Sequence, residues 1–282
     1  MDLFDLYQHV KRRFRESDVE DADLAARFLI RETCGISDSA FLIGGGAAVD
    51  NDLRARLESY AQRHIDGEPI SRILNRAAFW DLSFRVTPDV LDPRPETEMI
   101  ITRALKIMPR DSDIDIADLG TGSGCLIVTL MTLYSRARGW AVDKSPVALA
   151  VARDNAVAHG VEDRISFIEG NWLESPDRLF DLIVSNPPYI PNRDIANLDV
   201  SVKNYDPILA LDGGKDGFDA YRQIIPAIKK HLKQDGTALL EIGIFQAEKI
   251  ERLVEDSGLC VKSVHVDMSG IPRVVEISFG EK

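Results

Sequence analysis

Residues 114–124 are Ile114-Asp115-Ile116-Ala117-Asp118-Leu119-Gly120-Thr121-Gly122-Ser123-Gly124, and this stretch decides the fold class. Its first half, Ile114–Leu119, has the pattern of a strand, and segment 125–134 behind the glycines has the pattern of a buried helix. Glycines between a strand and a helix let the backbone turn tightly and point helix N–H groups at a ligand. The stretch therefore predicts the first strand, binding loop and helix of a βαβ unit.

Strands and helices alternate through the rest of the chain. Further strands are predicted at 139–142, 165–168, 180–185, 238–242, 261–266 and 274–279, and helices at 147–159, 218–233 and 246–257. This order predicts an α/β fold with a Rossmann-like, mostly parallel sheet that is doubly wound by helices. No convincing helix separates the last two strands, so we expect them to form a C-terminal antiparallel hairpin.

The chain before this unit has helical periodicity. Apolar residues recur at helical spacing from Leu3 to Phe14, and similar faces follow. We therefore expect a small N-terminal all-α domain at 1–75, with the docking of a protein substrate as its role. Gly44-Gly45-Gly46 is expected to be a turn, because no strand precedes it and no Lys-Ser/Thr pair follows it.

Segment 80–86 alternates strictly between apolar and polar residues, which predicts a half-buried strand. We expect this strand to belong to a β-hairpin linker at 76–91, followed by the α/β domain at 92–282. That domain opens with Asp92-Pro93-Arg94-Pro95-Glu96-Thr97-Glu98, whose prolines predict a helix entry and a stiff wall for a pocket.

The glycine loop, Gly120–Gly124, has the spacing G-x-G-x-G. Cys125 therefore stands where the dinucleotide fingerprint requires its third glycine, which argues against NAD and FAD. A Walker lysine is absent too, which argues against ATP hydrolysis. Cys125 itself is expected to be a small buried residue beside the cofactor rather than a nucleophile.

Polar and aromatic residues follow the next two strands in the order that an adenosyl group requires. Asp143 ends the second strand, where a carboxylate can accept both ribose hydroxyls, and Asn171 and Trp172 follow the third strand, where they can flank an adenine. This order without a phosphate cradle favours S-adenosyl-L-methionine, with Asp118 near its ammonium group. The candidate cofactor-binding residues are Gly120, Thr121, Gly122, Ser123, Gly124, Asp143, Asn171, Trp172 and Asn186.

The tetrapeptide Asn186-Pro187-Pro188-Tyr189, here called the N-P-P-Y motif, follows the apolar strand at 180–185 directly. Its prolines end the strand and fix the backbone, so the Asn186 amide oxygen and the Pro187 carbonyl are rigid acceptors at the carboxyl edge of the sheet. Such acceptors can hold the N–H groups of a planar amine or amide. A simple tight turn after the strand is the alternative.

The composition limits the classes of partner. Net charge is −12, and both the first 90 residues and the remainder are acidic, so direct binding of nucleic acid is not expected. The three cysteines and five histidines lack the spacing of a disulfide or metal site, which fits a cytoplasmic protein with no metal. No apolar run is long enough to predict a membrane span.

The chain from Gly67 to its C-terminus resembles the release factor glutamine methyltransferases, the PrmC/HemK family of class I methyltransferases. The motifs that carry the resemblance are Phe84-Arg85-Val86-Thr87-Pro88, Pro93–Glu98, the glycine loop, Ser185–Pro191, Ala210-Leu211-Asp212-Gly213-Gly214 and Glu241-Ile242-Gly243. The resemblance implies methyl transfer from S-adenosyl-L-methionine to the side-chain nitrogen (N5) of the glutamine in the Gly-Gly-Gln (GGQ) motif of peptide chain release factors.

The residues that we expect to act on the substrate are Asn186, Pro187, Pro188 and Tyr189. Asn186 Oδ1 and the Pro187 carbonyl would accept the two amide N–H bonds, and Tyr189 would pack on the amide plane. Two other classes remain open: an adenine amino methyltransferase acting on nucleic acid, which would share the N-P-P-Y motif, and a non-catalytic module with the same fold.

Overall fold

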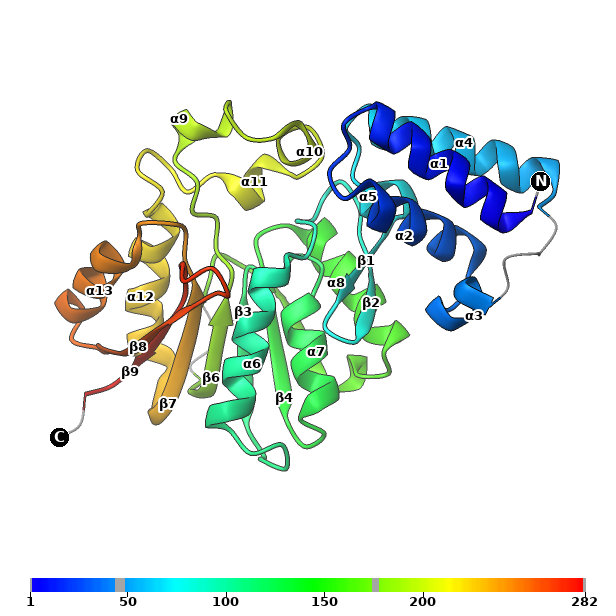
Figure 1. Cartoon of the computed structure of the whole chain (residues 1–282). Coiled ribbons are helices and arrows are strands. Elements are labelled where there is room, and N and C mark those ends of the chain that lie inside the picture. The colour runs from blue at the N-terminus through cyan, green and yellow to red at the C-terminus, as the bar shows by residue number, and fades with distance from the viewer. Residues whose placement is uncertain (1, 44–48, 174–177, 281–282) are drawn as a thin grey trace. The chain divides into compact units, whose positions relative to one another are not determined.

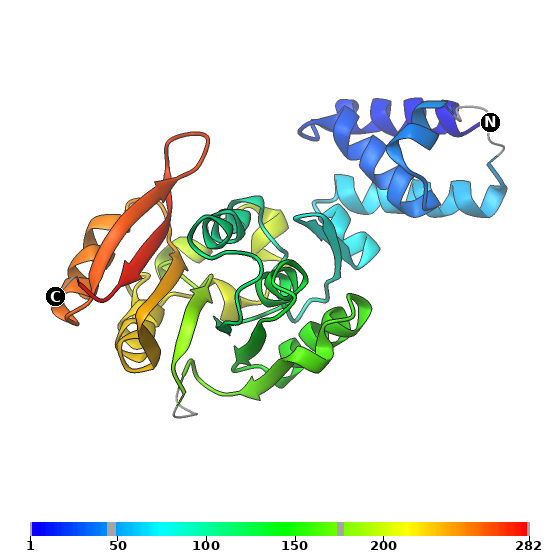
Figure 2. The same cartoon turned by 90° about the horizontal axis from the view of Figure 1, so that it is seen from below.

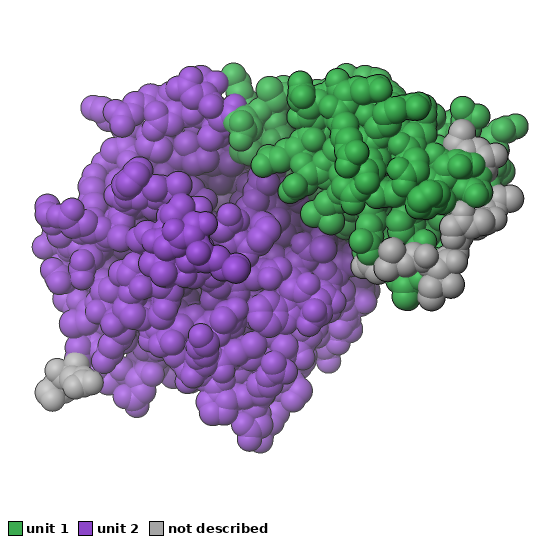
Figure 3. All heavy atoms as spheres, in the orientation of Figure 1, with its two compact units in different colours: residues 1–76, 199–205 green, residues 77–198, 206–282 purple. Residues whose placement is uncertain are grey.

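The computed structural model describes residues 2–43, 49–173 and 178–280, and these form two compact units. The first unit comprises residues 1–76 with 199–205, and the second comprises 77–198 with 206–282 (Figure 3). The triple glycine 44–46 lies outside the described residues.

The first unit is helical. Its helices are α1 (Leu3–Glu16), α2 (Ala22–Cys34), α3 (Asp38–Ile43), α4 (Asn51–Ile65), α5 (Ile70–Leu74) and the short α10 (Val200–Lys203). Asp2 and Asp5 form a capping box that begins α1, where two otherwise unpaired backbone N–H groups find acceptors. The apolar positions of α1 face a core shared with α2 and α4, in which Val10, Phe14 and Leu57 are fully buried. The predicted helical periodicity thus corresponds to one buried face.

A two-stranded hairpin of β1 (Arg76–Phe79) and β2 (Leu82–Arg85) follows α5, and all of it but Arg76 belongs to the second unit. The strand predicted at 80–86 is shorter than expected, because Trp80 adopts a left-handed conformation (φ 56°) in the turn. The alternating pattern therefore extends into the turn, and only its second part is a strand.

A seven-stranded sheet with the order β5-β4-β3-β6-β7-β9-β8 forms the centre of the second unit (Figure 1). Its strands are β3 (Asp115–Leu119), β4 (Arg138–Asp143), β5 (Ile165–Glu169), β6 (Phe180–Ser185), β7 (Leu232–Glu241), β8 (Cys260–Val266) and β9 (Pro272–Ser278). The first five are parallel, whereas β9 is antiparallel to both β7 and β8. This is the Rossmann-like, mostly parallel sheet predicted from the alternation of elements, including the C-terminal antiparallel hairpin. It is also the class I methyltransferase fold that the resemblance implies.

Helices cover both faces of the sheet, as the view from below shows (Figure 2). The longer of these helices are α6 (Glu98–Ile107), α7 (Cys125–Leu133), α8 (Pro146–Ala158), α12 (Asp219–His231) and α13 (Ala247–Asp256). Ile116 of β3 packs with α6 and α7 in one core, whereas its neighbour Ala117 packs with α12 and α13 in another. Successive strand residues point to opposite faces, so the residues of β3 contribute alternately to the two cores.

Short elements connect β6 to α12 and were not predicted. They are α9 (Asn192–Ile195), α10 and α11 (Ile208–Leu211), and two 3₁₀ turns lie elsewhere at Pro95–Thr97 (η1) and Glu162–Arg164 (η2). A helix of one turn buries too narrow a face to produce a periodic signal.

Candidate active site

The N-P-P-Y motif begins where β6 ends, as predicted. β6 pairs with β3 so that Ser185 lies opposite Leu119, and the Ser185 hydroxyl donates a 2.6 Å hydrogen bond to the Leu119 carbonyl. The ends of the two neighbouring strands are thereby held together. Asn186 consequently lies beside the glycine loop at the carboxyl edge of the sheet.

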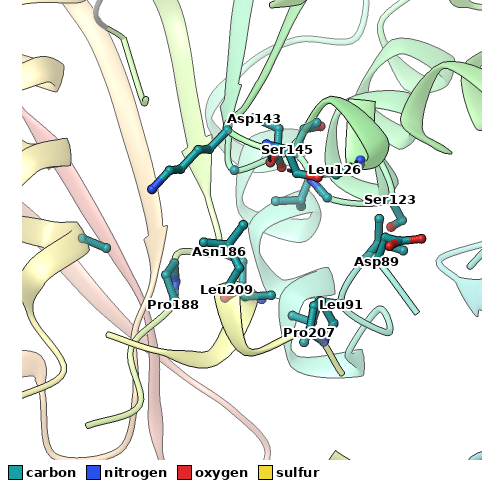
Figure 4. Close-up of a pocket in the computed structure, with 18 of the residues that line it drawn as sticks. Asp89, Leu91, Ser123, Leu126, Asp143, Ser145, Asn186, Pro188, Pro207 and Leu209 are labelled. Carbon is teal, nitrogen blue, oxygen red and sulfur yellow. Dashed lines mark hydrogen bonds between the residues drawn. The ribbon is translucent and has the colours of Figure 1, made fainter. Parts of the chain in front are cut away.

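A cavity of about 240 Å³ lies at this edge, within the second unit. Its walls come from the glycine loop, from Asp143 at the end of β4, from Asn171 and Trp172 after β5, and from Asn186 and Pro188. Figure 4 shows Asn186 and Pro188 beside Leu209 on one side of the cavity, and Asp143 and Ser145 on another. Residues predicted separately at four strand ends therefore line one cavity.

The glycine loop needs its glycines. Gly120, Gly122 and Gly124 have φ angles of 71°, 55° and 79°, which side chains rarely adopt. At Gly124 a Cβ would lie 3.0 Å from the Cβ of Ala152, so a side chain would push α7 away from α8. The N–H groups of Gly120 and Thr121 both donate to the Val142 carbonyl, at 2.8 and 3.0 Å. The loop is thus fixed before any ligand arrives.

Asp143 is held by the loop that it faces. Its Oδ2 accepts the Gly122 N–H at 2.9 Å and its Oδ1 accepts the Ser145 N–H at 2.8 Å. Burial raises the pKa of this carboxyl above its usual range, although these backbone donors oppose the change. Each oxygen keeps a further lone pair, so the carboxylate can accept the two hydroxyls of a ribose.

Asp118 lies beneath the loop and is 1% exposed. The Thr121 hydroxyl donates to its Oδ2 at 2.7 Å, whereas Oδ1 is buried with no hydrogen-bond partner among the described residues. Burial raises the pKa of Asp118 to about 7. Asp118 does not line the cavity. A cation bound in the cavity would therefore compensate the charge of Asp118 through space, without direct contact. An orphaned carboxylate oxygen of this kind fits a cofactor that carries an ammonium and a sulfonium group.

Asn171 and Trp172 line the cavity on the side of β5. Asn171 Nδ2 donates to Gln223 Oε1 at 2.9 Å, which ties this loop to α12. Trp172 is in a left-handed conformation (φ 57°), and its ring lies 3.5 Å from where a Cβ on Gly120 would be. A flat apolar wall beside a hydrogen-bonded amide suits a purine ring.

The four residues of the N-P-P-Y motif have different positions. Asn186 and Pro188 line the cavity, whereas Pro187 and Tyr189 do not. The Tyr189 hydroxyl is 3.4 Å from Glu241 Oε1, and burial raises the pKa of this phenol well above its usual value. Packing of Tyr189 on a substrate amide therefore stays a prediction.

Two residues next to Asn186 were missed as site residues. Asn186 Nδ2 donates to Thr97 Oγ1 at 3.0 Å, and Thr97 Oγ1 donates to Glu241 Oε2 at 2.6 Å. Both belong to motifs noted in the sequence, 93–98 and 241–243, but nothing local indicated that these motifs meet. Arg94 in the first motif lines the cavity and also pairs with the buried carboxylate of Asp206.

Cys125 lines the cavity, and burial raises its pKa to about 12, so it is a thiol at neutral pH and a poor nucleophile. Within residues 2–43, 49–173 and 178–280, no group of three or more His, Cys, Asp or Glu side chains could hold a metal ion. Across the same ranges, no helix is long and apolar enough to cross a membrane.

Known proteins resemble this chain over most of its length. The family model "Methyltransferase small domain" matches residues 102–203, and "PrmC N-terminal domain" matches residues 5–74. The "Release factor glutamine methyltransferase" of Bradyrhizobium diazoefficiens is 40% identical over 93% of this chain and 90% of its own length. The protein of the same name from Caulobacter vibrioides is 35% identical over 94% of this chain and 92% of its own length. That from Geobacter sulfurreducens is 38% identical over 92% of this chain and 90% of its own length.

Solved structures resemble the fold at low sequence identity. The hMettl16 catalytic domain in complex with an RNA hairpin has a TM-score of 0.58 at 15% identity, covering 85% of this chain and 87% of its own. A methyltransferase from Pyrococcus furiosus has a TM-score of 0.54 at 17% identity, covering 82% of this chain and 100% of its own. At these identities the likeness shows the class I methyltransferase fold alone.

Proposed function

We propose that this chain, which belongs to the release factor glutamine methyltransferase family, methylates the side-chain amide (N5) of the glutamine in the GGQ motif of peptide chain release factors. The methyl donor is S-adenosyl-L-methionine, the cofactor of this class of enzyme. The observation that carries the proposal is the position of Asn186, whose side chain lines the same cavity as the glycine loop and Asp143. An amide bound by Asn186 would therefore lie beside the methyl donor.

The cofactor would be held by the residues that line the cavity. The glycine loop would lie against its methionine part, Asp143 would accept the ribose hydroxyls, and Asn171 and Trp172 would flank the adenine. When bound, S-adenosyl-L-methionine supplies an electrophilic methyl group on a positively charged sulfur. The buried Asp118 carboxylate favours that charge and the ammonium group through space.

The residues of the N-P-P-Y motif would activate the substrate. An amide nitrogen is a weak nucleophile, because its lone pair is delocalised into the carbonyl. Asn186 Oδ1 and the Pro187 carbonyl accept the two N–H bonds, which orients the nitrogen for in-line attack and favours the positive charge that develops on it. The nitrogen loses one proton to water after transfer, so this scheme needs no dedicated base.

The substitution Asn186→Ala tests the proposal. We expect the variant to bind S-adenosyl-L-methionine within about threefold of wild type but to methylate roughly 100-fold or more slowly, since one positioned group in a transition state has an effect of this size. Calorimetry measures binding, and peptide mass spectrometry of the release factor locates the methyl group. Asn51→Ala, at the exposed start of α4, is the matched control. Undiminished turnover in Asn186→Ala would refute the proposed role.

The same assay separates the substrate classes. Labelled methyl groups should enter the release factor and not DNA or RNA, because the chain is strongly acidic at −12. A release factor with glutamine replaced in the Gly-Gly-Gln motif should accept none. We place the reaction in the cytoplasm, where Cys34, Cys125 and Cys260, all free in the structure, would remain thiols.

A further inference from the structure

Two sequence motifs that the proposed reaction does not use meet next to Asn186. Thr97 lies in the η1 turn, and Glu241 is the last residue of β7, 144 positions further along the chain. Both side chains are buried, with Thr97 2% and Glu241 1% exposed. The three polar groups form a chain, in which Asn186 Nδ2 is 3.0 Å from Thr97 Oγ1, and Thr97 Oγ1 is 2.6 Å from Glu241 Oε2.

The number of hydrogen atoms decides how this chain is oriented. A threonine hydroxyl has one hydrogen, and an ionised carboxylate can only accept. The hydroxyl hydrogen of Thr97 therefore points at Glu241, and only lone pairs remain for Asn186. Asn186 must turn its NH₂ group to Thr97, which leaves its Oδ1 as the group available to the cavity.

We propose that the Thr97–Glu241 pair positions the Asn186 side chain so that it presents an acceptor, and not a donor, to the substrate amide. The inference rests on the proposed function, since it assigns the orientation of the group that holds the glutamine. Thr97 and Glu241 are positioning residues in this scheme, because their effect reaches the substrate through Asn186.

The same geometry makes the orientation depend on the charge of Glu241. A protonated Glu241 can donate to Thr97, whose own hydrogen is then available to Asn186 Oδ1. The amide would turn over, and its NH₂ group would face the N–H bonds of the substrate. Two donors facing each other cannot form a hydrogen bond, so this state would hold the substrate poorly.

Glu241 is able to change its charge near neutral pH. Burial raises its pKa to about 7, and the charge of Glu96 in η1 acts in the same direction. Hydrogen bonds from Thr97 and Tyr189 and the charge of Arg273 on β9 oppose this change. The other ionisable neighbours are Tyr221 of α12, whose hydroxyl donates to the Glu241 carbonyl at 2.8 Å, and Cys125 of α7. The turnover rate should consequently rise with pH through about 7.

Replacement of Thr97 is the first test. Thr97→Val keeps the shape but removes the hydroxyl, and kcat should fall about tenfold, the usual effect of one hydrogen bond. Thr97→Ser keeps the hydroxyl and should stay within about threefold of wild type. Thr129→Val is the matched control, since the Thr129 hydroxyl is fully buried in α7 without a partner among the described residues. Calorimetry of cofactor binding and thermal melting show whether each variant retains the fold.

The pH profile of Glu241→Gln is the second test, and it does not depend on Thr97→Val folding well. The glutamine side chain has no titratable proton, so the orientation of the Asn186 amide does not change with pH in this variant. Wild-type kcat should fall about tenfold from pH 8 to pH 6, because only about a tenth of a group with a pKa near 7 is ionised at pH 6. The kcat of the variant divided by that of wild type should therefore rise about tenfold from pH 8 to pH 6. Groups that titrate equally in both proteins do not affect this ratio.

A ratio that stays constant from pH 8 to pH 6 would overturn the inference, as would a kcat of Thr97→Val equal to that of Thr97→Ser. Asn186→Ala in the same series separates this inference from the proposed function. If Asn186→Ala methylates normally, the proposed role of Asn186 is wrong. If Asn186→Ala is inactive while the ratio is constant, only the positioning role of Thr97 and Glu241 is wrong.

Discussion

Strand β3 carries a buried aspartate near each of its ends, and the two are treated differently. Asp115 at the amino end is 8% exposed, and its carboxylate lies 2.9 Å from Arg138 Nε, 3.4 Å from Arg178 Nη1 and 3.9 Å from Lys233 Nζ. Asp118 at the carboxyl end is 1% exposed, and it has the hydroxyl of Thr121 but no cation beside it among the described residues.

The difference is between a carboxylate with cations of the chain beside it and a carboxylate without them among the described residues. At the amino edge the chain supplies its own cations, so the charge is compensated whether or not a ligand is bound. At the carboxyl edge, burial raises the pKa of Asp118 and of Glu241 to about 7 in each case. Buried negative charge without a paired cation thus lies on the side where a cationic methyl donor would bind. The burial of this charge lowers the free energy of unfolding.

The largest effect that would test this comparison is the pH dependence of folding stability at the carboxyl edge. The pKa of Glu241 is raised from 4.5 to about 7 in the folded state, so the folded protein holds its proton after the unfolded chain has lost it. The free energy of unfolding of wild type relative to Glu241→Gln should therefore fall by about 3 kcal/mol as pH rises from 4.5 to 7, and then level off.

Urea unfolding at pH 4.5 and pH 8 measures this change. Glu255→Gln on the exposed face of α13 is the control and should differ little from wild type at either pH. A wild type that gained stability relative to Glu241→Gln between these two pH values would contradict the account of the carboxyl edge.

A smaller effect is expected when the charge of Asp118 is removed. Asp118→Asn keeps an acceptor for Thr121 but no longer compensates the positive charges of the cofactor. We expect the affinity for S-adenosyl-L-methionine at pH 8 to fall roughly 30-fold, about 2 kcal/mol, while the ligand-free protein melts no lower than wild type. Calorimetry and thermal melting measure the two quantities. An unchanged affinity would show that Asp118 acts only within the fold.

The smallest effect is expected at the amino edge. Asp115→Asn leaves Arg138, Arg178 and Lys233 without their shared carboxylate, but these side chains are 59%, 42% and 40% exposed and can turn to water. We therefore expect a loss of only about 1 kcal/mol in the free energy of unfolding and no change in cofactor affinity. A loss of cofactor affinity as large as that of Asp118→Asn would remove the distinction between the two edges.

Much of the catalytic unit could be predicted from the sequence, because its strands are short, apolar and bounded by clear signals. Strand β6 spans Phe180–Ser185 as predicted, since an apolar run is stopped by two prolines. Strand β7 begins at Leu232, whereas the sequence predicted a start at 238. The prediction missed the first half because it carries the polar residues Lys233, Gln234 and Asp235 and pairs irregularly with β6. The pattern there reflects local exposure and conceals the strand.

The candidate site was predicted where it depends on strand ends and missed where it depends on distant contacts. The glycine loop, Asp143 and Asn186 each follow a strand, so their place at one edge follows from parallel topology. The contact between Thr97 and Glu241 joins positions 144 apart in the chain, and no periodicity or local motif encodes such a distance. The sequence did not predict that residues 199–205 belong to the first unit, for the same reason.

Segment 199–205 limits how the helical unit can be exchanged between proteins of this kind. Residues 199–205 follow the N-P-P-Y motif in the chain, yet they group with residues 1–76, and a Cβ on Gly67 would lie 3.1 Å from Val200. The helical unit is therefore encoded in two separate stretches. A single crossover at residue 76 would exchange its first part and leave the second behind. A chimera that exchanges the whole helical unit must therefore carry both stretches.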